Sequence, residues 1–152
     1  MKVPRLSFSE RAPETNELAI VRLERDLSVR FPSDYRDFLL TVNGGRPSPG
    51  HLRFDYAGET DVFHVHFFFG VADPEVSCDL IWNAEATRET RAPAILPIAR
   101  DDYGCLFYLT VSGPRTGEVL FGGLPQDGVV SYGRVADSFS GFLEMLGTYP
   151  IE

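Results

Sequence analysis

One segment of fifteen residues, Phe31 to Gly45 (FPSDYRDFLLTVNGG), contains a short helix together with the signals that start and stop it. The residue before Pro32 is disfavoured from the helical region, so any preceding helix must end there. Ser33 follows as an N-cap candidate, and acidic Asp34 in the first turn suits both the free N–H groups and the helix dipole. The residues 43–45 (Asn-Gly-Gly) tolerate a positive φ and can close the helix. The fold must therefore accommodate a short, independent helix with one apolar face.

The rest of the chain alternates between helical and extended patterns. Apolar residues at helical spacing predict an amphipathic helix over 14–30. A helix is predicted over 77–89 with Ser77 as its cap, and another begins after Asp137 or Ser138 and runs through Leu146. Two prolines and a glycine predict a loop at 46–50. Extended segments rich in apolar, β-branched or aromatic residues are found at 51–56, 62–69, 95–99, 104–111 and 118–121.

Two N-terminal helices, a block of strands interrupted by one inserted helix, and a C-terminal helix predict an α+β fold with a mainly antiparallel, twisted sheet. The chain has 152 residues, which suffices for one domain that buries about 70% of the surface of its unfolded chain. No repeat or linker divides it, so we expect a single domain over 1–152. No apolar run approaches the ~20 residues of a membrane span, and residues 1–5 lead into no secretory signal. We therefore expect a cytoplasmic protein that does not enter membranes.

Charge is distributed unevenly along the chain. The net charge of −8 argues against nucleic acid as the main partner, because phosphate binding needs clustered Lys or Arg. Between Phe54 and Thr87 there are seven acidic residues and no Lys or Arg. This window is either a solvated surface that maintains solubility or a face that steers and docks a basic partner. The candidate docking residues in it are Asp55, Glu59, Asp61, Asp73, Glu75, Asp79, Trp82 and Glu85.

A series of short motifs gives the chain a likeness to a known group. The chain resembles the SUKH superfamily, which includes fungal cell-wall-assembly regulators and many bacterial immunity proteins, in the order and spacing of motifs between about residues 14 and 147. These are the first helix from Leu18 to Leu27, Pro32-Ser33-Asp34-Tyr35, Phe38-Leu39, Asn43-Gly44-Gly45, Phe69-Gly70, Leu96-Pro97-Ile98-Ala99, Asp101-Asp102-Tyr103-Gly104, Gly117-Glu118-Val119, and Val135-Ala136-Asp137-Ser138-Phe139 with Phe142-Leu143.

The resemblance implies a non-catalytic protein-binding domain that needs no cofactor. In bacteria such domains are often antidotes that bind and neutralise a toxin delivered by neighbouring cells. The acidic window is compatible with this function, because nuclease toxins tend to have basic nucleic-acid-binding faces. The alternative is a scaffold or regulatory interaction domain without a toxin partner.

The histidines of one predicted strand could bind a metal or be ordinary surface residues. His64 and His66 would lie about 7 Å apart on one face of a strand, where they either offer two imidazoles to a metal or are polar positions on an exposed face. A third ligand, such as His51, Asp61 or Asp73, has no supporting spacing, so we expect neither a metal site nor a metal-dependent enzyme.

Catalytic residues are not expected elsewhere either. Cys105 has acidic neighbours that would raise its pKa and lower its reactivity, and we interpret both it and Cys78 as reduced thiols. The carboxylate pairs in the predicted turns resemble ordinary solvated acids more than acid–base pairs. Trp82 is either partly buried core or a binding anchor, and Tyr56, Tyr103 and the run 67–69 (Phe-Phe-Phe) carry the same ambiguity.

Overall fold

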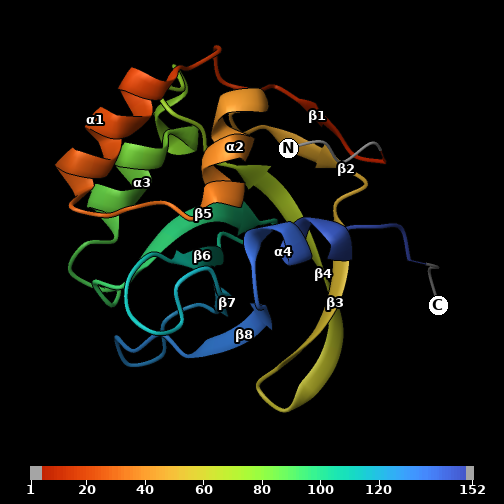
Figure 1. Ribbon diagram of the computed structural model, residues 1–152. Helices are drawn as coiled ribbons and strands as arrows, with labels where there is room; N and C mark the ends of the chain where they lie inside the picture. The colour runs from red at the N-terminus through yellow and green to blue at the C-terminus, as the bar shows by residue number, and fades with distance from the viewer. Residues whose placement is uncertain (1–4, 150–152) are drawn as a thin grey trace.

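The computed structural model describes residues 5–149 and contains a six-stranded antiparallel sheet (Figure 1). Its strand order is β3-β4-β5-β6-β7-β8, so each strand pairs with the next one along the chain. The predicted α+β class and antiparallel sheet are confirmed. The strands are β3 (His51–Tyr56), β4 (Glu59–Phe68), β5 (Ile95–Asp101), β6 (Leu106–Thr110), β7 (Val119–Gly122) and β8 (Tyr132–Ala136).

A second, two-stranded sheet was missed by the sequence prediction. β1 (Ser7–Ser9) pairs antiparallel with β2 (Arg46–Ser48), with Phe8 opposite Pro47. The predicted loop at 46–50 is therefore wrong over its first three residues. β8 was not predicted either. Strands this short carry no clear periodicity, and their stability comes from a partner that lies elsewhere in the sequence.

Helices lie in all four predicted regions. They are α1 (Glu17–Leu27), α2 (Ser33–Thr41), α3 (Leu80–Ala86) with a preceding 3₁₀ turn η1 (Val76–Cys78), and α4 (Phe139–Met145). None of the helices within residues 5–149 has the length and apolarity needed to cross a bilayer. Helix α1 is shorter than predicted, because the Asn16 side chain caps it by accepting from the Ala19 N–H at 2.9 Å.

Two predicted N-caps are wrong by one or two residues. Pro32 occupies the cap of α2, because its carbonyl already accepts the first helical bond from the Arg36 N–H. Asp79, not Ser77, caps α3 by accepting from the Trp82 N–H, and η1 fills the preceding turn. The prediction for α4 is confirmed, with Ser138 Oγ accepting from the Gly141 N–H at 2.9 Å.

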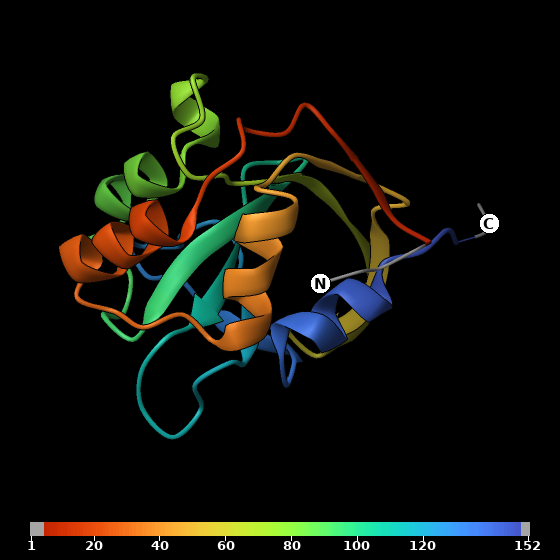
Figure 2. The same ribbon diagram turned by 45° about the horizontal axis from the view of Figure 1, so that its top comes forward.

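The helices form two groups around the sheet. Helices α2 and α4 lie against each other over one face of the sheet, whereas α1 and α3 lie side by side near its end (Figures 1 and 2). The core between α2, α4 and the sheet is built from aromatic rings. The ring of Phe38 lies 5.0 Å from that of Phe139 and 5.4 Å from that of Phe68. Phe107 and Phe142 continue this packing at 5.3 Å.

Asn43 explains the Asn-Gly-Gly signature that ends α2. It is buried at a φ of 59°, where its side chain donates to the carbonyls of Pro13 (2.7 Å) and Val71 (3.1 Å) and accepts from the Val71 N–H (2.8 Å). Gly44 follows at a φ of 84°, and a Cβ there would meet the Phe68 carbonyl at 2.8 Å. These residues fasten the N-terminal segment and the end of β4 to α2.

The sheet curls so that its first and last strands, β3 and β8, come into contact. Tyr56 at the end of β3 links this strand to the segment between β7 and β8. Its hydroxyl donates to the Ser131 carbonyl at 2.7 Å and accepts from the Gly123 N–H at 2.9 Å. A Cβ at Gly133 would meet the Tyr56 ring at 2.8 Å, so the absence of a side chain at 133 makes this approach feasible.

Candidate functional site

The eight candidate docking residues of the acidic window fall into two groups on different sides of the molecule. Asp55, Glu59 and Asp61 belong to the β3–β4 hairpin, whereas the other five lie in the segment 73–85 that contains η1 and α3. Both views show the hairpin well separated from α3 (Figures 1 and 2). A window that is continuous in sequence therefore does not form a single face.

Two carboxylates of the second group have structural tasks. Asp79 accepts from the N–H groups of Trp82 (3.0 Å) and Asp73 (3.2 Å), and Asp73 accepts from the Glu75 N–H (2.9 Å). These bonds build the turn that leads into α3. Glu85 is exposed and lies 3.6 Å from Arg88. Only the exposed Glu75 and Glu85 are therefore suited to charge-reversal experiments in this group.

The exposure of the aromatic residues shows which of them belong to the core and which lie at the surface. Trp82 is 47% exposed beside the exposed Ile81, so it lies at the surface of α3 and not in the core. The run 67–69 is buried, and Tyr56 is half-buried with a hydrogen-bonded hydroxyl. Tyr103 is 83% exposed.

An acidic cleft of about 610 Å³ lies beside the hairpin. Residues of β3, β4, the β5–β6 turn, β7 and the loop after β7 line it, and its carboxylates belong to Asp61, Asp101 and Asp102. No Lys or Arg lines it within the part of the chain that the structure describes. The rings of Phe63, Tyr103 and Phe121 form apolar parts of its wall. A cleft with this lining suits a cationic group that can also contact aromatic faces.

The turn between β5 and β6 holds Tyr103 at this cleft. Asp101 is buried, and its Oδ1 accepts from the N–H groups of Tyr103 (2.9 Å) and Cys105 (2.8 Å). The Asp101 N–H in turn donates to the Cys105 carbonyl at 2.8 Å. The exposed ring of Tyr103 is therefore carried by a backbone fixed at three points, and exposed Leu124 lines the same cleft. A rigid aromatic side chain of this kind is a typical binding anchor.

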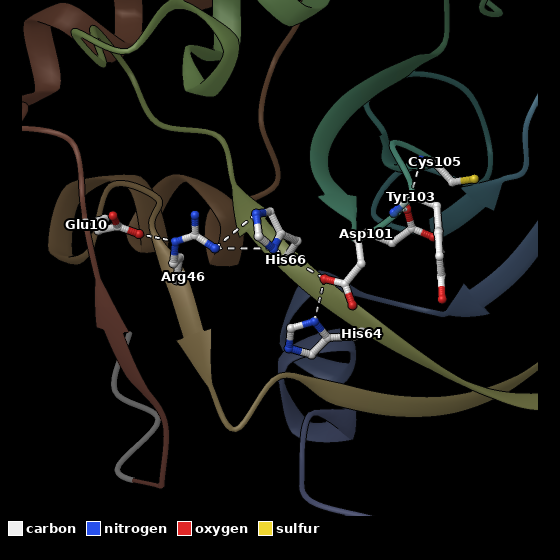
Figure 3. A network of polar contacts seen from close by, with 8 residues as sticks. Glu10, Arg46, His64, His66, Asp101, Tyr103 and Cys105 are labelled. Atoms are coloured by element: carbon white, nitrogen blue, oxygen red, sulfur yellow. Dashed lines mark hydrogen bonds and ion pairs between the residues drawn. The ribbon is translucent and has the colours of Figure 1, made fainter.

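His51 and His64 line the acidic cleft, and His66 contacts Asp102 beside it; Figure 3 shows His64 and His66. Asp102 Oδ1 lies 2.8 Å from His64 Nδ1 and 3.3 Å from His66 Nδ1. The His51 ring packs on the His64 ring with centroids 4.4 Å apart. On the other side, Arg46 Nη1 lies 3.0 Å from His66 Nε2, and Glu10 pairs with Arg46.

The histidines thus engage one another, Asp102 and Arg46. As expected for an exposed strand face, the side chains of His64 and His66 are about one-third exposed while Val65 between them is buried. Over residues 5–149, no group of three or more His, Cys, Asp or Glu side chains is arranged to hold a metal ion.

Cys105 is a poor candidate nucleophile. Burial raises the pKa of its thiol, and the neighbouring Asp101 raises it further. The thiol therefore stays protonated at neutral pH, which lowers its reactivity as the sequence predicted. Burial likewise raises the pKa of Cys78, and both cysteines are free.

The sequence prediction missed the roles of Asp102 and Leu124 at the cleft. The available signal was the turn Asp101-Asp102-Tyr103-Gly104, whose first Asp can bond its own backbone two residues on. Leu124 carried no signal, because only the folded sheet brings the loop after β7 to the hairpin.

One family comparison is informative. The model of the SMI1 / KNR4 family (SUKH-1) matches residues 14–145, which is most of the chain. No curated protein matches the sequence significantly. Proteins of this family are generally non-enzymatic, and membership supports an immunity-type or regulatory domain.

Proposed function

The chain belongs to the SMI1 / KNR4 family (SUKH-1), and from this premise we propose that it is an immunity protein that binds and neutralises a cognate toxin. The acidic cleft and the β3–β4 hairpin form the docking face. The observation that carries this assignment is Tyr103, an 83% exposed ring on a turn fixed by buried Asp101. Aromatic side chains that are held rigidly contribute large contact area at a small entropic cost.

Charge supports a basic partner. Glu59 and Asp61 are exposed on the hairpin that borders the cleft, and the cleft lining contributes no positive side chain within the described residues. A basic surface, such as the nucleic-acid-binding face of a nuclease toxin, is complementary to this arrangement. We infer that docking there covers the toxin's functional site.

The decisive experiment uses the candidate toxin encoded by the neighbouring gene. Calorimetry should detect a complex, and the protein should protect cells that express the toxin. Because truncating a central aromatic anchor commonly costs about 2 kcal/mol or more, Tyr103→Ala should weaken binding roughly 30-fold. Failure to form any complex, together with no protection, would refute the proposal.

A matched control separates the two acidic surfaces. Trp82→Ala truncates an exposed aromatic on α3, away from the cleft, and should change the affinity less than about threefold. Glu59→Lys with Asp61→Lys should slow association and reduce its salt dependence, whereas Glu75→Lys with Glu85→Lys should not. The reverse pattern would move the docking face to the η1–α3 surface.

A further inference from the structure

Asp102 is placed to receive a cation in the acidic cleft. Its side chain is nearly half exposed, and both contacts that it makes with imidazoles fall on Oδ1. Oδ2 has no partner among residues 5–149, which leaves one carboxylate oxygen for a ligand. Aromatic rings nearby, among them Phe63 and Tyr103, provide faces on which a planar guanidinium can stack.

The charge around Asp102 depends on protonation of the histidines. His64 meets His51 from β3 and Asp102 from the β5–β6 turn, whereas His66 meets Asp102 and Arg46, which Glu10 pairs in turn. Asp61 and Asp101 complete the charged lining. These groups include four carboxylates (Glu10, Asp61, Asp101 and Asp102) and one guanidinium (Arg46), so their formal charge is −3 with neutral imidazoles and zero with all three imidazoles protonated.

We propose that the acidic cleft receives one cationic side chain of the partner, preferably arginine, that Asp102 is its ion-pair acceptor, and that His64 and His66 make this contact pH-dependent. The inference deepens the proposed function and rests on it, since it gives the chemistry of the partner at the same cleft.

The sign of the pH effect follows from competition for Asp102. Imidazoles change charge between about pH 5 and 8, and protonated imidazoles beside Asp102 are cations that compete for the same carboxylate. They then repel an incoming guanidinium and neutralise its acceptor. Affinity for the cation is therefore full at pH 8 and lost toward pH 5, and binding at an intermediate pH releases protons.

The test needs no partner protein. N-acetyl-arginine amide is titrated into ¹⁵N-labelled protein at pH 8.0 and 5.5, with N-acetyl-citrulline amide as its uncharged, nearly isosteric control. The arginine probe should shift the amide signals of Tyr103 and Leu124 with a Kd on the order of 1 mM at pH 8.0, the affinity typical of so small a ligand. Binding should be at least about fivefold weaker at pH 5.5, and citrulline should cause no comparable shifts.

Two variants assign the groups. Asp102→Asn should abolish the shifts in the cleft, while Asp26→Asn, which removes an exposed carboxylate on α1, should leave them unchanged. His64→Gln with His66→Gln should lose less affinity for arginine between pH 8.0 and 5.5 than the wild type, with His51 as the remaining imidazole at the cleft. Equal shifts from arginine and citrulline, shifts confined to other surfaces, or an unchanged Kd in the wild type between pH 8.0 and 5.5 would overturn the proposal. These wild-type readouts do not depend on any variant folding.

The outcome is separable from that of the proposed function. If the arginine probe fails but Tyr103→Ala still weakens the toxin complex, the docking face stands and the arginine contact falls. If the probe binds as expected but no toxin complex forms, the cation site stands without the immunity role.

Discussion

Asp34 in the first turn of α2 accepts two hydrogen bonds from Ser140 in the first turn of α4. Its Oδ2 lies 2.9 Å from the Ser140 backbone N and 3.1 Å from Oγ, while Oδ1 accepts from the Tyr35 N–H at 2.8 Å. One carboxylate thus accepts hydrogen bonds from N–H groups at the start of two helices. Asp34 and Ser140 are 106 residues apart in the sequence. The Asp of the Pro-Ser-Asp-Tyr motif therefore links α2 to α4 through hydrogen bonds.

Asp34→Asn should lower the free energy of unfolding by about 1–3 kcal/mol, because an amide cannot replace both acceptor oxygens. Urea unfolding at pH 7 measures the loss. Asp26→Asn serves as the control on exposed α1 and should change stability by no more than about 0.5 kcal/mol. Equal stability of the two variants would show that the bonds to Ser140 contribute nothing net.

Asn43→Asp should be more damaging, although the side chain keeps its size. The carboxylate cannot donate to the carbonyls of Pro13 and Val71, and it is buried against both of them. We expect a loss of about 3 kcal/mol or more in urea unfolding at pH 7. The loss should shrink at pH 5, because a protonated carboxyl regains one donor; a loss that grows as the pH falls would contradict this account.

Tyr35→Phe should preserve or increase stability. Tyr35 is fully buried, and its hydroxyl has no hydrogen-bond partner within residues 5–149. Removing an unsatisfied hydroxyl should raise the free energy of unfolding by about 0–1.5 kcal/mol at pH 7. A loss larger than about 1 kcal/mol would reveal a partner for the hydroxyl.

The same tyrosine predicts a characteristic loss of stability in alkali. Burial raises the pKa of Tyr35 well above its ordinary value of 10.0, and it raises the pKa of Tyr108 to about 12. The stability that these groups contribute is fully present below pH 10 and is lost as the pH rises, because only the unfolded chain then ionises. Each buried tyrosine should cost about 1.4 kcal/mol per pH unit above pH 10. Urea unfolding between pH 9 and 11 should therefore give a shallower decline for Tyr35→Phe than for the wild type.

Asp101→Asn tests whether the turn is preorganised. The substitution weakens acceptance from the Tyr103 and Cys105 N–H groups. We expect about 1–2 kcal/mol of lost stability and faster hydrogen exchange at these two amides. Tyr103→Ala, at an exposed ring, should change the free energy of unfolding by less than about 0.5 kcal/mol. Unchanged exchange in Asp101→Asn would mean that the turn is held by its backbone alone.

The fold was predictable wherever the signal was local. Ser138 caps α4 as predicted, and the helical patterns located all four helices, because caps and apolar spacing act within a few residues. The pair β1 and β2 was not predictable, because Phe8 and Pro47 meet only in the folded chain. When a strand forms only by pairing with a distant segment, its own three residues contain too little information to predict it.

The candidate site shows the same division. The acidic composition of the hairpin was visible in the sequence, but Asp102 joins it only because β5 pairs with β4. Conversely, Asp73 and Asp79 share the charge of the window but serve the turn before α3. Net charge in a window of sequence therefore does not distinguish a docking carboxylate from a capping one.

The bridge made by Tyr56 has a consequence for self-association. A sheet whose terminal strands are open can recruit a strand from another chain, which leads to oligomers or aggregates. Here the hydroxyl of Tyr56 bonds backbone groups of Gly123 and Ser131 at one end of β3, and at the other end the backbone of His51 exchanges two hydrogen bonds with Gly147, so both ends of this strand are held from within the same chain. Holding this edge from within the chain lowers the chance that copies of the protein associate through their strand edges.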